Sequence, residues 1–184
     1  MRSRPQDPSD EDLLAAHVAG DPEAFTLLVT RYQDRLWAVA LRTLRDPHDA
    51  ADALQDAFLC AFRRAHTFRG DAKVTSWLHR IVINCCLDRI RYLDRRRTAV
   101  LDTDRTDHDP VMPSTDSELS DAVTEALARI SPDQRAALVL VDMEGFSVDE
   151  AAEMLGCPPG TIKSRCSRGR ARLAPLLREL LAPR

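Results

Sequence analysis

The stretch SVDEAAEMLGCPPGTIKSRCSRGRARL, residues 147–173, decides the fold of the second half of this 184-residue chain. Ser147 and Glu150 form an S-x-x-E capping box, which marks the start of a helix. Gly156 permits a turn, and the Pro-Pro-Gly sequence of residues 158–160 leads into a second helix. Two helices joined by so short a turn predict a helix-turn-helix.

The second of these helices separates apolar from basic residues. Ile162, Cys166, Gly169 and Leu173 recur at helical spacing, so we expect them to face inward. The other face combines forked cationic side chains with small hydroxyl residues, the donors that a helix needs in a DNA major groove. The residues expected on the DNA side are Lys163, Ser164, Arg165, Ser167, Arg168 and Arg170. A cationic surface helix that only ends a bundle is the alternative interpretation.

The rest of the chain also follows helical patterns. Asp21-Pro22, Asp46-Pro47 and Ser131-Pro132 each place a capping side chain before a proline, which suits the first position of a helix. Apolar residues recur at helical spacing, and long alternation of period two is missing, so the chain is expected to be all-α. The expected helices cover residues 10–18, 22–44, 47–65, 75–95, 118–130, 132–143, 148–155 and 160–181.

The helices fall into two groups, separated by residues 98–118. That segment is rich in aspartate and proline and has few large apolar residues, so we expect a flexible acidic linker. The sequence therefore predicts two small helical domains, residues 1–97 and 119–184, on either side of it.

Charge is arranged in blocks along the chain. The net charge of -3 divides into -5 for residues 1–60, +7 for 61–97, -11 for 98–160 and +6 for 161–184. Clustered Lys and Arg side chains release counterions from phosphate backbones, so two basic segments favour two contacts with a polyanion. Solvated helix faces are the alternative interpretation of the same pattern.

The composition argues against several other classes of protein. The chain has five cysteines without a C-x-x-C pair, six glycines, and none of the common nucleotide-binding, hydrolase or zinc-protease motifs. We therefore expect no metal, no cofactor and no enzymatic activity, although an α-helical enzyme is a formal alternative. The acidic N-terminal residues do not resemble a signal peptide, which predicts a cytoplasmic protein without membrane contact of its own.

The first basic block follows an acidic helix. Asp49, Asp52 and Asp56 form one stripe on the helix over 47–65, opposite Leu54 and Phe58, and such a stripe suits a basic protein partner. A polar loop and a basic helix come next, with cation and amide donors suited to phosphate contacts and some base recognition. These donors are Lys73, Arg80, Asn84, Arg89 and Arg91. The indole of Trp77 suits either a stacked base or, more readily, the core.

Together these motifs resemble the sigma-70 family of bacterial RNA polymerase sigma factors, and within it the small extracytoplasmic-function (ECF) group. The resembling motifs, in chain order, are Asp21-Pro-Glu-Ala-Phe25, Asp49-Ala-Ala-Asp52-Ala-Leu-Gln55-Asp56-Ala-Phe58, Trp77-Leu-His-Arg-Ile81 with Asn84 and Asp88-Arg89, Ser131-Pro-Asp-Gln-Arg135, and Gly160-Thr-Ile-Lys-Ser-Arg165 with Arg168-Gly-Arg170. The Arg-rich, Lys-poor composition is similar to that of actinobacterial members. Asp56 stands where the family more often has Glu, and Cys166 and Gly169 replace larger residues, which bears on promoter preference.

The resemblance implies a role for each motif. The clamp of the largest subunit of core RNA polymerase would be contacted by Asp49, Asp52, Gln55 and Asp56. The second helical domain, residues 119–184, would correspond to region 4 of the family and would contact the flap of the second subunit. Residues 69–76 would form the loop that captures a flipped base of the non-template strand at the minus-ten element, and Asn84 with the basic residues after it would hold that strand. The expected minus-ten residues are Arg69, Lys73, Ser76, Arg80, Asn84, Arg89 and Arg91. The helix-turn-helix would bind the minus-thirty-five duplex of promoter DNA, and an anti-sigma factor would restrain the protein.

One alternative from a different functional class stays open at this point. An ordinary helix-turn-helix regulator would pair this second half with an N-terminal sensing or dimerising domain. Such a regulator binds two half-sites as a dimer, whereas a sigma factor acts as one copy beside the polymerase.

Overall fold

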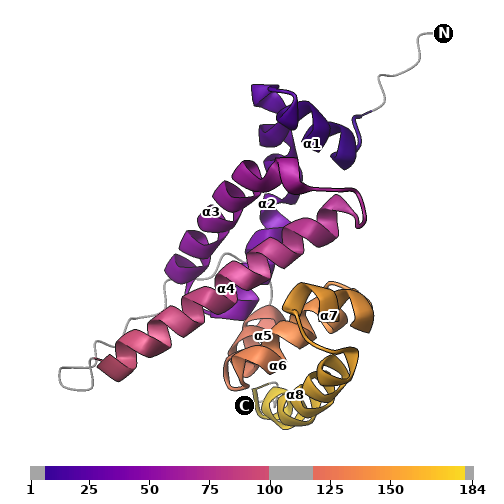
Figure 1. The fold of residues 1–184 in the computed structure, drawn as a ribbon. Coiled ribbons are helices and arrows are strands. Elements are labelled where there is room, and N and C mark those ends of the chain that lie inside the picture. Colours follow the sequence, from indigo (N-terminus) through magenta and orange to yellow (C-terminus); the bar gives the residue numbers. More distant parts are fainter. Residues whose placement is uncertain (1–6, 100–117, 181–184) are drawn as a thin grey trace.

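The computed structural model describes residues 7–99 and 118–180, with side chains over 7–96 and 122–179. Within these ranges the fold is entirely helical, as expected (Figure 1). The helices are α1 (Asp10–Val18), α2 (Pro22–Leu44), α3 (Pro47–Arg64), η1 (Ala65–Thr67), α4 (Val74–Ala99), α5 (Glu118–Ala128), α6 (Pro132–Leu138), η2 (Val139–Met143), α7 (Val148–Leu155) and α8 (Pro159–Leu180).

The helices begin where the capping residues of the sequence predicted. The side chains of Asp21 and Asp46 accept hydrogen bonds from backbone amides in the first turns of α2 and α3. Ser131 takes the N-cap position of α6 without a side-chain cap bond. The helix expected over 132–143 is divided, because its last five residues widen into the π-helical turn η2. Helices α4 and α5 occupy both ends of the expected linker, and its residues 100–117 lie outside the described part of the chain.

Helix α3 packs against α2 and α4 through small side chains. Its buried face consists of Ala50, Ala53, Ala57 and Ala61, which let the neighbouring helices approach closely. The larger apolar residues of α3 are therefore displaced toward solvent. Phe62 is 50% exposed and packs edge-on against Phe25.

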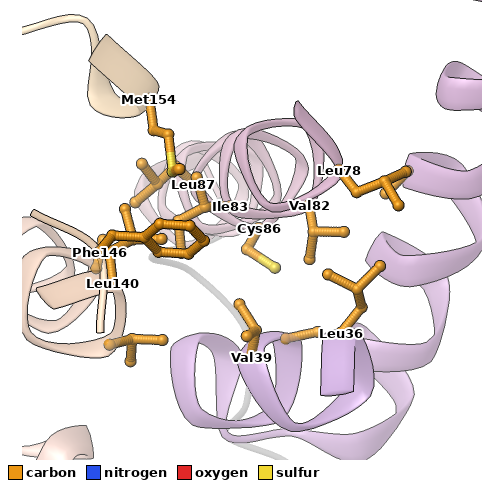
Figure 2. Packing of buried hydrophobic residues seen from close by; sticks show 14 of the residues in the cluster. Leu36, Val39, Leu78, Val82, Ile83, Cys86, Leu87, Leu140, Phe146 and Met154 are labelled. Carbon is orange, nitrogen blue, oxygen red and sulfur yellow. The ribbon is translucent and has the colours of Figure 1, made fainter. Parts of the chain in front are cut away.

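Helix α4 is buried on two sides (Figure 2). The buried Leu78 and Val82 lie on the side of α4 that faces the other helices of the first half. Ile83 and Leu87 face the second half of the chain. Burial raises the pKa of the Cys86 thiol to about 12, so this cysteine acts as a small apolar residue in the core.

The second half of the chain forms the expected helix-turn-helix. The capping box of Ser147 and Glu150 is present, and Gly156 ends α7 in the left-handed conformation. Ile162 and Cys166 of α8 point inward as predicted. Gly169 is buried where a Cβ atom would lie 2.8 Å from Leu138 Cδ1, so glycine permits the close packing of α8 on α6.

The two halves lie against each other. Helix α7 packs on α4, and both α5 and α6 contact α2 (Figure 1). Phe146, Leu140 and Met154 extend from the second half toward Ile83 and Leu87 of the first half (Figure 2). The buried apolar residues of both halves consequently form one continuous cluster.

Candidate polymerase and nucleic-acid interfaces

The acidic stripe of α3 is partly occupied by a cation from α4. Arg89 donates to Asp49 Oδ1 at 2.8 Å and to Asp52 Oδ2 at 2.9 Å. The hydrogen bond that Arg89 donates to Asp49 is the largest reason that the pKa of Arg89 is raised. Gln55 and Asp56 lie exposed on the same helix. The structure therefore joins a residue expected to bind DNA to two residues expected to bind polymerase.

An apolar groove runs beside this stripe, between α2 and α3. It has a volume of about 450 Å³, and Phe25, Trp37, Leu54 and Phe58 contribute to its walls. Gln55 of the polymerase-binding set lines it as well. The groove was not predicted from the sequence. A signal was present, because alanines occupy the buried face of α3 and its large apolar residues must therefore lie outside the core.

Four residues around the loop between α3 and α4 meet at one cavity. It has a volume of about 340 Å³ and is lined by Arg69, Ser76, Trp77 and Arg80 among others. Trp77 also packs edge-on against Phe68, with ring centroids 5.7 Å apart. An aromatic wall with guanidinium and hydroxyl donors can hold a nucleobase by stacking and hydrogen bonding.

The other minus-ten residues extend away from this cavity. Lys73 is exposed at the start of α4, and Arg91 pairs with Asp88 at 2.8 Å. Asn84 lies one turn beyond Arg80, and its Nδ2 donates to the backbone carbonyl of Met154 at 3.3 Å. The structure thus groups Arg69, Ser76 and Arg80 and leaves the others spread along α4.

The second wall of the cavity comes from helix α7. Glu150, Glu153 and Met154 line it opposite the basic residues. The backbone amide of Ser147 donates to Glu150 and is the largest reason that the pKa of this carboxyl is lowered; the charge of Lys73 contributes in the same direction. Two carboxylates therefore line the same cavity as three residues that were expected to contact DNA.

Helix α8 presents its basic face to solvent. Lys163, Ser167 and Arg168 are exposed, and Arg168 bonds to Ser164 one turn earlier. The remaining two cations are held within the second half. Arg165 pairs with Asp133 at 2.7 Å, and Arg170 pairs with Asp142 at 2.6 Å, which raises the pKa of Arg170.

Two polar clusters that sequence analysis missed join the halves. Glu144, whose side chain is 6% exposed, accepts from Arg35 Nε at 2.7 Å and lies 3.2 Å from His79 Nε2 and 3.9 Å from Arg42. Burial alone would raise the pKa of Glu144, but the hydrogen bonds from His79 and Arg35 outweigh it and lower the pKa. The buried Arg135 donates to the carbonyl of Thr43, at the end of α2, at 2.5 Å.

Comparison with known proteins gives matches over both halves. Residues 28–96 match the family model "Sigma-70 region 2", and residues 120–173 match "Sigma-70, region 4". The ECF RNA polymerase sigma factor SigM of Mycobacterium tuberculosis is 53% identical over 170 residues, which cover 92% of this chain and 85% of SigM. The RNA polymerase sigma-H factor of Pseudomonas aeruginosa is 33% identical, over 92% of this chain and 96% of that protein.

Solved structures agree with these matches. The sigma factor RpoE of Bartonella quintana, solved in complex with the anti-sigma factor NepR, has a TM-score of 0.73 and 30% identity, over 85% of this chain and 98% of that one. CnrH, solved in complex with the cytosolic domain of CnrY, has a TM-score of 0.67 and 29% identity, over 94% and 99%. No helix in the described parts of this chain is both long and apolar enough to cross a bilayer.

Proposed function

The chain belongs to the ECF group of the sigma-70 family of RNA polymerase sigma factors, and from this premise we propose which of its surfaces bind polymerase, melted promoter strand and promoter duplex. The family consists of transcription initiation factors rather than enzymes. The observation that carries the assignment is the cavity where Arg69, Ser76, Trp77 and Arg80 meet, because these four residues lie within the region 2 match. Work on DNA beside the polymerase would place the protein in the cytoplasm.

Core polymerase would bind the exposed side of α3. Gln55 and Asp56 are accessible there, and the groove beside Gln55 offers apolar area to a partner helix. Asp49 and Asp52 would contribute less directly, because Arg89 already neutralises part of their charge. The clamp of the largest subunit and the flap of the second subunit are the proposed contacts of regions 2 and 4.

Two surfaces would bind different elements of the promoter DNA. The cavity beside Trp77 would take a flipped base of the minus-ten strand, and exposed cations along α4 would hold the adjoining phosphates. Lys163, Ser167 and Arg168 of α8 would enter the major groove of the minus-thirty-five duplex. Arg165 and Arg170 would orient that surface or contact phosphate once their acidic partners release them.

An anti-sigma factor is the proposed regulatory partner. The solved RpoE, which resembles this chain over both halves, is held by the anti-sigma factor NepR. The apolar groove on α2 and α3 is a surface that a helix of such a factor could share with polymerase.

Charge reversal at Asp56 tests the polymerase surface. We expect Asp56→Lys to weaken binding to purified core polymerase by roughly tenfold or more, because like charges placed across an interface are strongly unfavourable. Glu11→Lys, which reverses an exposed acid of α1, is the matched control and should bind normally. The measurement is fluorescence anisotropy of labelled protein titrated with core enzyme.

Two further results decide between this function and a dimeric regulator. Run-off transcription from a genomic promoter library should require both core enzyme and this protein, and one copy should enter each complex. Unchanged affinity of Asp56→Lys, together with a native circular dichroism spectrum, would remove α3 from the interface. A dimer that binds palindromic duplexes without polymerase would contradict the whole assignment.

A further inference from the structure

Part of the surface proposed to receive the melted strand lies against the second half of the same chain, although Arg69, Lys73 and Arg80 are exposed. Helix α7 packs on α4, and Met154, only 4% exposed, lies against Ile83 and Leu87 (Figure 2). The side chain of Asn84 is held by the carbonyl of Met154. A nucleic-acid strand along this part of α4 would need the space that α7 fills.

The charges of α7 resemble those of the ligand that it displaces. Glu150 and Glu153 line the same cavity as Arg69 and Arg80. The hydrogen bond from Ser147 favours the ionised form of Glu150, so at neutral pH a carboxylate stands where a phosphate would bring its charge. Helix α7 therefore brings negative charge to the basic side of the cavity and also occupies space beside it.

Glu144 fixes this arrangement. Its carboxylate belongs to the second half, whereas the three basic side chains around it, Arg35, Arg42 and His79, belong to the first. His79 is fully buried; its Nδ1 contacts the carbonyl of Thr75, and its ring packs on Phe146. Removing Glu144 would leave the buried His79 without its carboxylate partner and would release Arg35 and Arg42 from the second half.

We propose that this chain closes on itself, with helix α7 covering the part of the minus-ten surface of α4 around the cavity and Asn84, and the Glu144 cluster holding the two halves together until polymerase or DNA displaces α7. The closed state is a self-imposed block on promoter binding. It rests on the proposed function of the α4 surface, and it needs no second protein.

The experiment measures the fluorescence of Trp77, which lines the cavity between α4 and α7. In a Trp37→Phe background Trp77 is the single tryptophan, because the chain has two. We expect Glu144→Ala to raise the acrylamide quenching of Trp77 and to enlarge the radius of gyration in solution scattering. The affinity for the fluorescein-labelled non-template strand of a promoter recovered by run-off selection should rise roughly tenfold, since charge-assisted hydrogen bonds of this kind carry about that factor.

Two further variants make the outcome decisive. Asp149→Ala removes an exposed carboxylate from α7 itself and should change none of the three readouts. Arg35→Glu, at a half-exposed position of α2, opposes Glu144 by repulsion and should open the chain if Glu144→Ala does not fold. If folded Glu144→Ala and Arg35→Glu keep the quenching and dimensions of the unaltered chain while the wild-type holoenzyme transcribes, the closed state is wrong and the sigma function stands. If the wild-type chain does not support transcription with core enzyme, the proposed function itself fails.

Discussion

Arg135 is a buried guanidinium whose hydrogen bonds go to backbone carbonyls. Besides Thr43 it donates to Leu127, Ala128 and Ile130, which lie at the end of α5 and just beyond it. Carbonyls at a helix C-terminus lack partners within the helix, so a cation there satisfies them and interacts well with the helix dipole. One side chain thus caps two helices, one from each half. Burial lowers its pKa to about 10, which leaves it charged at neutral pH.

Gly169 gives a prediction about stability. Gly169→Ala should lower the free energy of unfolding by up to about 2 kcal/mol, because overpacking against Leu138 costs about 1–3 kcal/mol while the better helix propensity of alanine returns about 1 kcal/mol. Gly160→Ala is the matched control, since a Cβ atom there meets nothing within 4 Å. Urea denaturation of both variants measures the difference. Equal stability of the two would show that α6 and α8 adjust freely.

At the scale of the elements, the sequence predicted much of the fold and less of the site. Helix starts marked by Asp21, Asp46 and the Ser147 capping box were confirmed, because local hydrogen bonds decide them. The helix expected over 75–95 was confirmed as α4. Its second buried side, at Ile83 and Leu87, was missed because a helix that is apolar on two sides needs a tertiary neighbour to explain it.

The charged contacts were less predictable still. Arg89 lies 40 positions along the chain from Asp49, and Glu144 lies 65 from His79. Such pairings arise only when helices pack, and helical spacing within one segment carries no information about them. The sequence therefore predicted which residues are basic or acidic and could not predict which of them meet.

Helices α4 and α8 are expected to act at different steps of initiation. Arg80→Ala should impair strand opening, whereas Arg168→Ala should weaken duplex binding by a factor of about 10–100, the range for contacts to bases. A promoter with a pre-melted bubble over its minus-ten element should then rescue Arg80→Ala and leave Arg168→Ala defective. Transcription from matched normal and bubble promoters measures this. Equal rescue, or rescue of neither, would contradict the separation of roles.

At the scale of the whole molecule, the contact between the halves should depend on pH. The pKa of Glu144 is lowered in the folded chain, so its contribution is complete above the unfolded pKa and is lost as pH falls through the folded value. Glu144→Gln should therefore be less stable than the wild type at pH 7, by about 1–3 kcal/mol. The gap should close under acid conditions, where the wild-type carboxyl is also neutral. Urea denaturation between pH 7 and acid pH tests this, and a gap that widens on acidification would exclude Glu144 as the titrating group.

The π-helical turn η2 makes the length of this segment as important as its composition. The amide of Glu144 bonds to the carbonyl of Val139, five residues back, and the amide of Phe146 bonds to that of Leu140. In a regular helix one residue corresponds to a rotation of about 100°. In a homologue that lacks a single residue here, the side chains corresponding to Glu144 and Phe146 would be rotated by a quarter-turn or more away from His79. Insertions and deletions between residues 139 and 143 would therefore rotate the residues that follow relative to the first half of the chain, even where every substitution around them is conservative.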